Sequence, residues 1–223
     1  MPVALGLEKI TEESPEYLGL ENVVTDEMAE VAVVMDKRVP ITAAEVAKKC
    51  GKPLARTEEL LEELALRGVI EYNRENEDHH KQYVLPMFVP GSAEYMNMNL
   101  DTVTAHPEVA TMFERMSRLP LEKITPMVPP GGAGIGMHVV PVEKAIPSEQ
   151  KSVDLEHLSH WLDKYDGKCA VGACSCRRSR RVRDEGCDHL EEDMCIAVGD
   201  MATYAIETNK ARPTTREEVM EIL

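Results

Sequence analysis

The sequence predicts an α+β fold that is mostly helical, in which two folded domains are joined by a connector. Three observations support this prediction. Apolar residues recur mainly with helical spacing, two strand-like segments flank a polar turn between residues 69 and 85, and four cysteines fall within 22 residues near the C-terminal end. We expect a first domain over residues 1–90, a helical and Gly/Pro-rich connector over 91–150, and a cysteine-bearing domain over 151–223.

The first domain has the element order of a winged helix-turn-helix. Thr25 begins one helix, and Thr42-x-x-Glu45 is a capping box for a second that ends at Gly51. A third helix covers residues 54–67, two strands follow at 69–72 and 82–85, and the polar turn at 73–81 corresponds to the wing. The apolar residues expected to face the core are Met28, Val31, Ala32, Val34, Met35, Leu54, Leu60, Leu61, Leu64 and Ala65.

The charge of the third helix disfavours DNA binding, although this fold often binds DNA. A recognition helix brings Arg, Lys, Asn or Gln to base edges and cations to phosphates. Here the helix carries Glu58, Glu59, Glu62 and Glu63 against Arg56 and Arg67, in a chain of net charge −15. We therefore expect no nucleic-acid partner and a packing or protein-docking role. His79 and His80 are expected in an exposed polar turn and not at a metal.

The connector begins as helix and then becomes irregular. Residues 92–119 have helical apolar spacing with a break at Pro107, and residues 129–136 are rich in proline and glycine. A Gly-rich loop that cradles phosphate follows a strand and precedes a helix. Here two prolines precede the glycines and a strand-like segment, 137–142, follows them. We expect a flexible connector or a loop that shields a cofactor.

The cysteine-bearing domain is predicted to start with an amphipathic helix over 154–165, with Leu155, Leu158, Trp161 and Leu162 facing inward. A short buried strand, 169–172, then delivers the chain to Cys174. Residues 194–208 have the pattern of a helix, and Thr215-x-x-Glu218 caps a last one. Because the chain stops on apolar residues, we expect a fragment or a subunit whose last helix docks elsewhere.

Four of the six cysteines form a candidate metal-binding set. They are Cys174, Cys176, Cys187 and Cys195. Four thiolates suit a [4Fe-4S] cluster or a closed zinc site. Zinc sites generally use Cys-x2-Cys, whereas Cys-x-Cys suits a wider target, so the spacing favours iron–sulfur and leaves zinc as the alternative. Cys169 is expected to act as a small buried hydrophobe, with a spare metal ligand as the alternative, and Cys50 is expected to be structural.

Five arginines between the second and third of these cysteines add weight to an anionic centre. Guanidinium groups near a [4Fe-4S] cluster would stabilise its more reduced form. We expect Arg177, which adjoins Cys176, to lie beside the metal centre. The alternative is that the arginines pair with the acidic residues that follow, which are Asp184, Glu185, Asp188, Glu191, Glu192 and Asp193.

The remaining sequence features indicate a cytoplasmic protein with no membrane partner. No stretch of about 18 apolar residues is present. The N-terminal residues lack the charged and apolar regions of a signal peptide. The cysteines are therefore expected to be reduced thiols or metal ligands.

Several segments of the chain resemble an iron–sulfur domain of anaerobic bacteria. These segments are residues 123–126, 140–147, 174–177, 186–188 and 194–199. Together with the winged helix, residues 7–223 resemble the N-terminal region of large FAD-dependent pyridine nucleotide-disulphide oxidoreductases. The resemblance implies that Cys174, Cys176, Cys187 and Cys195 hold the cluster. It also implies a flavin- or ferredoxin-containing oxidoreductase partner, in a chain that ends before any flavin-binding segment and is not catalytic alone.

The function expected from these features is that of an electron-transfer module with one [4Fe-4S] cluster. Two alternatives stay open. One is a redox-sensing winged-helix transcription regulator, which the acidic third helix disfavours. The other is a zinc-stabilised interaction module, which metal analysis would distinguish from the iron–sulfur reading.

Overall fold

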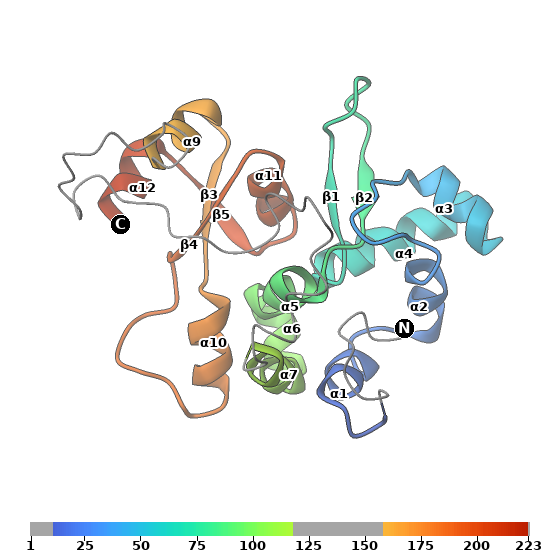
Figure 1. The fold of residues 1–223 in the computed structure, drawn as a ribbon, viewed down its shortest axis with the longest axis horizontal. Coiled ribbons are helices and arrows are strands. Elements are labelled where there is room, and N and C mark those ends of the chain that lie inside the picture. The colour runs from blue at the N-terminus through green and yellow to red at the C-terminus, as the bar shows by residue number, and fades with distance from the viewer. Residues whose placement is uncertain (1–10, 118–157, 223) are drawn as a thin grey trace, which may run out of the picture.

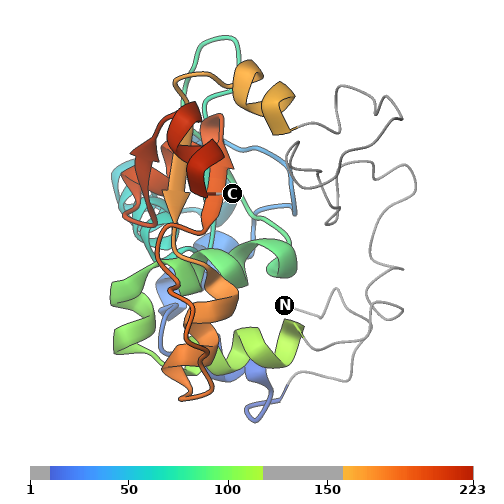
Figure 2. The ribbon, with the colours of Figure 1, turned by 90° about the vertical axis from the view of Figure 1, so that its left-hand side faces the viewer.

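The structure is a computed structural model that describes residues 11–117 and 158–222. Its described part is a mixed α and β fold, mostly helical, with two small antiparallel sheets (Figures 1 and 2). The expectation of a mostly helical α+β fold is confirmed at this level. No helix within the described ranges has the length and apolar character needed to cross a membrane.

The N-terminal half begins with four helices and a hairpin. The first helix was not predicted, whereas the other three and the hairpin follow the order expected for residues 22–86. The elements are α1 (Pro15–Glu21), α2 (Asp26–Ala32), α3 (Ala43–Cys50), α4 (Leu54–Arg67), β1 (Glu71–Asn73) and β2 (Gln82–Val84). The predicted caps are present: the Thr25 hydroxyl accepts from the Met28 N–H, and Thr42 and Glu45 form the capping box. Ile41 pairs with Tyr83 in an isolated bridge, which ties the start of α3 to the hairpin.

Short helices follow the hairpin. They are the π-helix η1 (Phe88–Ser92), α5 (Ala93–Met98), α6 (Leu100–Ala105) and α7 (Glu108–Ser117). The predicted break at Pro107 separates α6 from α7. A second break at Asn99 was not predicted; its side chain accepts a hydrogen bond of 3.0 Å from the Thr102 N–H and so caps α6.

The C-terminal part is a three-stranded sheet with helices around it. Its elements are α9 (Leu158–Lys164), β3 (Cys169–Gly172), α10 (Ser175–Val182), β4 (Cys195–Val198), α11 (Asp200–Glu207), β5 (Ala211–Thr214) and α12 (Arg216–Ile222). The buried strand β3 lies in the centre, antiparallel to β4 and to β5. Figure 1 places α11 between this sheet and the β1–β2 hairpin, and it contacts both.

One core joins the two parts of the chain. Apolar residues of α2, α4, the hairpin, α5 and α7 form a single buried cluster, and the fully buried Tyr204 of α11 belongs to it. The Tyr204 ring packs edge-on against Tyr72 and Tyr95, with ring centroids 5.1 and 5.4 Å away. A smaller cluster contains Leu162, Cys169 and Val219.

Two expectations are corrected. Residues 195–198 form strand β4, not the start of a helix, because they pair along the whole length of β3, and the helix begins only after Gly199. Leu54 is 46% exposed, because the first turn of α4 lies beyond the edge of the core. The last helix, α12, packs Val219 onto Leu162 and Cys169.

Some predicted features lie outside the described residues. They are the Gly/Pro-rich segment 129–136, the strand-like segment 137–142, Leu155, and the matching segments 123–126 and 140–147.

Candidate metal centre

Strand pairing brings the first and last candidate ligands to the same edge of the C-terminal sheet. Gly172 at the end of β3 pairs with Cys195 at the start of β4. Beyond this pair, the Met194 N–H donates to the Gly172 carbonyl over 2.9 Å, and the Cys174 N–H donates to the Glu191 carbonyl over 2.7 Å. Cys174 is the N-cap residue of α10, so Cys176 lies in the first turn of that helix.

The thiols of Cys174, Cys176 and Cys195 meet at this edge. Hydrogen bonds with the thiols of Cys176 and then Cys195 lower the pKa of Cys174 well below its usual value. The hydrogen bond to Cys174, followed by burial, raises the pKa of both Cys176 and Cys195. The three side chains are therefore electrostatically coupled, with Cys174 in contact with both of the others.

Backbone N–H groups at the start of α10 contribute to the electrostatics of two of these sulfurs. Those of Cys176 and Arg177 help to lower the pKa of Cys174, and that of Ser175 acts to lower the pKa of Cys195, although the Cys174 side chain accepts no capping hydrogen bond. The first N–H groups of a helix have no partner within the helix and carry partial positive charge. They stabilise a thiolate at this position, as helix N-termini do for reactive and metal-binding cysteines.

Cys187 lies on the loop that follows α10. Its neighbour Gly186 packs on the last turn of that helix, where an added Cβ would lie 3.3 Å from the Arg181 Cα. The Cys187 thiol is exposed on the loop of residues 183–194, which connects the end of α10 to β4 (Figure 1).

No complete metal site is formed by the side chains present. Within residues 11–117 and 158–222, no group of three or more His, Cys, Asp and Glu side chains is arranged to hold a metal ion. The thiols of Cys176 and Cys195 nevertheless each interact with that of Cys174. Cys187, the fourth predicted ligand, is exposed on the loop that follows α10.

Most arginines of α10 fasten the loop that carries Cys187. The Arg177 guanidinium donates to the Leu190 carbonyl over 2.8 Å, so Arg177 addresses Cys174 only through its backbone N–H. Arg181 donates to the His189 carbonyl and pairs with Glu191, and Arg183 pairs with Glu185. Arg181 and Arg183 therefore pair with acidic residues of the loop, which was the alternative expected from the sequence.

Arg178 links the site to the N-terminal half. Its guanidinium is buried, pairs with the buried Glu191 over 2.9 Å, and donates to the Asn97 and Met98 carbonyls over 3.2 and 2.6 Å. These carbonyls end α5, where a cation is favoured by the helix dipole. Arg178 therefore holds α10, the loop and α5 together.

Two carboxylates near Cys176 were not predicted from the sequence. The negative charges of Glu94 and Glu114 contribute to the raised pKa of Cys176. Glu114 is buried beside Phe113 and forms a 3.1 Å ion pair with Arg180. The sequence did contain one signal for Glu114, which directly follows Phe113 in the apolar stripe of α7. Glu94 receives the Gly91 N–H over 2.6 Å, and burial raises its pKa.

The other two cysteines lie as expected for buried residues of the scaffold. Cys169 in β3 is buried, its thiol lies 3.8 Å from the Tyr165 carbonyl, and burial raises its pKa. The half-buried Cys50 places its thiol 3.7 Å from the Ala47 carbonyl at the end of α3. Both thiols therefore hydrogen-bond to the local backbone.

No family model, curated protein or solved structure matches this chain. A function for the chain therefore has to be argued from its own residues and their geometry.

Proposed function

We propose that this chain is an electron-transfer module that carries one [4Fe-4S] cluster on Cys174, Cys176, Cys187 and Cys195. It would pass electrons to or from a flavin- or ferredoxin-containing oxidoreductase domain or subunit and would not be catalytic alone. The observation that supports this proposal most directly is the interaction of the Cys174 thiol with those of Cys176 and Cys195 at the start of α10.

The residues around the thiols suit an anionic sulfur ligand set. A cluster supplies one-electron chemistry, with a potential that depends on hydrogen bonds to its sulfurs. The N–H groups of Ser175, Cys176 and Arg177 would supply such bonds from rigid backbone. The fourth thiolate would come from Cys187, which is exposed on the loop that follows α10.

We further propose that the N-terminal half is a winged helix that docks to protein and does not bind nucleic acid. The order α2, α3, α4, β1, β2 and the Ile41–Tyr83 bridge support the fold. The four glutamates of α4 oppose a nucleic-acid partner. A cytoplasmic location is proposed with it, because reduced thiols persist in that compartment.

Metal and sulfide analysis of protein purified without oxygen tests the cluster. We expect brown protein with about four iron and four sulfide per chain, since four thiolates hold one such cluster. About one zinc per chain with no visible absorbance would instead indicate the zinc-stabilised interaction module. Anaerobic handling matters because an exposed cluster is lost in air.

Cysteine variants identify the ligands. Serine at position 174, 176, 187 or 195 (C174S, C176S, C187S, C195S) should remove or destabilise the cluster, because thiolate is the preferred ligand. Cys169→Ala and Cys50→Ala are the matched controls and should keep the iron content unchanged, because both thiols contact only the local backbone. Retention of a full cluster in Cys187→Ser, with loss in Cys169→Ala, would show that the ligand set is wrong.

A further inference from the structure

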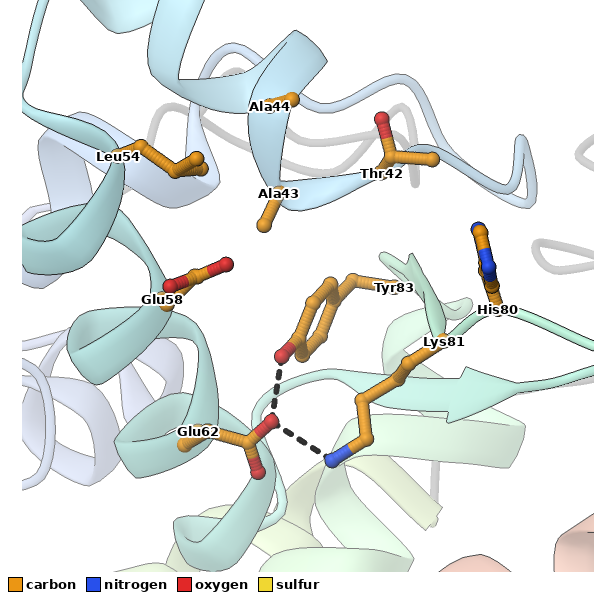
Figure 3. Close-up of a pocket in the computed structure, with 9 residues that line it drawn as sticks. All are labelled: Thr42, Ala43, Ala44, Leu54, Glu58, Glu62, His80, Lys81 and Tyr83. Atoms are coloured by element: carbon orange, nitrogen blue, oxygen red, sulfur yellow. Dashed lines mark hydrogen bonds and ion pairs between the residues drawn. The ribbon is translucent and has the colours of Figure 1, made fainter.

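A groove opens on the N-terminal half between the start of α3, the first turns of α4 and the end of the β1–β2 turn. Its volume is about 540 Å³, within the range of small-ligand and side-chain pockets. Figure 3 shows Tyr83 at its floor, with Ala43 and Ala44 on one side and Leu54 and Glu58 on another. The groove lies on the opposite side of the molecule from α10 (Figure 1).

One part of the groove wall is apolar, whereas Thr42, His80 and Lys81 line the rest together with the two glutamates. Ala43 and Ala44 present methyl groups from the first turn of α3, and Leu54 faces the groove from the first turn of α4 (Figure 3). A single exposed leucine is ordinary. Here the half-exposed Leu54 and the two alanines line the same groove, which offers a short apolar channel to an extended aliphatic chain.

One carboxylate in the groove is uncompensated. Glu59 pairs with Arg56 over 2.7 Å, and Glu63 pairs with Arg67 over 3.2 Å. Glu62 accepts from the Lys81 amine and from the Tyr83 hydroxyl, over 2.7 and 2.5 Å. In the described part of the chain, Glu58 is the only one of these four glutamates without a hydrogen bond or ion pair, and Figure 3 shows its carboxylate between Leu54 and Tyr83.

We infer that this groove binds a basic side chain, arginine or lysine, presented by a segment of a partner protein. Both side chains combine an aliphatic stem with a cationic head. The stem fits along Ala43, Ala44 and Leu54, and the head reaches Glu58. The net charge of −15 draws basic surfaces toward the chain.

Charge selects this occupant over the other candidates. A phosphate group would meet Glu58 and Glu62, whose negative charges repel it. A wholly apolar segment would cover the Glu58 carboxylate without pairing it, and burying an unpaired charge is costly. Lys81, on the far side of the groove, already forms an ion pair with Glu62. Glu58 is therefore the charge in the groove that attracts a cation. The inference does not depend on the metal centre.

Titration with a short peptide, followed by NMR, tests the inference on the full chain. The probe is acetyl-Leu-Arg-Leu-amide, and the matched control peptide replaces arginine with citrulline, its neutral isostere. We expect the arginine peptide to shift the resonances of Ala43, Ala44, Leu54 and Glu58 in a saturable way. The citrulline peptide should bind roughly threefold more weakly, which is what an exposed ion pair contributes.

Variants locate the charge. Glu58→Gln should weaken the arginine peptide roughly threefold and abolish its preference over citrulline. Glu59→Gln makes the same change of charge one residue away, at a carboxylate that Arg56 already neutralises, and should leave the preference intact. Equal binding of both peptides, or equal effects of the two variants, overturns the inference. Shifts of the same resonances with protein concentration alone overturn it too, because they assign the groove to a second copy of the chain.

Discussion

At the scale of single residues, Lys210 is unusual for a lysine because it is only 3% exposed. Its amine donates to the carbonyls of Ala65 and Leu66 over 2.9 Å each and lies 4.9 Å from the centre of the Tyr204 ring. Carbonyls at the end of α4 and an aromatic face both favour the charged amine. Burial opposes them and lowers the pKa of Lys210 to about 7.

This pKa gives the unfolding free energy a pH dependence. Below pH 7 the amine is charged in both states, whereas from pH 7 up to its ordinary pKa of 10.5 the folded protein holds fewer protons than the unfolded chain. The stability of the native sequence should therefore rise with pH across this window. Lys210→Met should lack that rise. Denaturant midpoints of both proteins, measured anaerobically from about pH 7 to about pH 9.5, check it; parallel profiles would contradict it.

At the scale of elements, two helices of the N-terminal half end in the same way but in different surroundings. Gly51 after α3 and Gly68 after α4 both adopt left-handed backbone, with φ of 73° and 85°. A Cβ at Gly51 would meet nothing within 4 Å, whereas one at Gly68 would lie 2.5 Å from the carbonyl carbon of Tyr95. The end of α4 is therefore held against the backbone of α5.

Alanine at the two glycines separates these effects. Gly51→Ala should cost about 1 kcal/mol of unfolding free energy, the usual penalty of left-handed backbone for a residue with a Cβ. Gly68→Ala carries the same penalty and must also displace α5, so we expect a loss of about 3 kcal/mol or more. Denaturant unfolding of the two variants makes the comparison. Equal losses would show that α5 yields without cost.

At the scale of the whole molecule, polar contacts and a shared core join the two halves. The Tyr72 hydroxyl donates to Glu207 over 2.6 Å, and the Arg74 N–H donates to Asp200 over 2.7 Å, so α11 is fastened along β1. Together with the contacts of Tyr204, Lys210 and Arg178, they connect α10, which carries Cys176, to α4 through packed elements. The acidic helix α4 is thus part of the same folded unit as the cysteines, in a chain of net charge −15.

A chain with this charge should bind duplex DNA only very weakly. Affinity for DNA depends on cations that replace phosphate counterions, and α4 presents carboxylates instead. Titration of a labelled mixed-sequence duplex at about 0.15 M salt should give a dissociation constant above about 100 μM, weaker than ordinary non-specific binding. The titration is carried out separately with oxidised and with reduced protein. Tight binding that changes with redox state would favour the redox-sensing regulator.

Local sequence signals predicted α2, α3, α4 and the hairpin of the N-terminal half, but not α1. The capping box of Thr42 and Glu45 and the helix-ending Gly51 and Gly68 depend on neighbours three or four residues away, and all are present. Predictions failed where a distant partner decides the outcome. The short segment 195–198 suits a strand or a helix equally, and its pairing with β3 makes it a strand. Strand β5 was missed because it contains Pro213, which an edge strand tolerates.

The sequence by itself determined which residues are candidate ligands and that the third helix is acidic, because both are properties of composition and spacing. Only the tertiary structure decided how the ligands meet. The β3–β4 register brings Cys195 to the strand end that leads into Cys174, and Gly186, the neighbour of Cys187, packs on the last turn of α10. The same holds for Lys210 and Tyr204, which reach the end of α4 from about 140 residues along the chain. Such contacts depend on strand pairing and core packing between distant segments, which no local pattern of residues encodes.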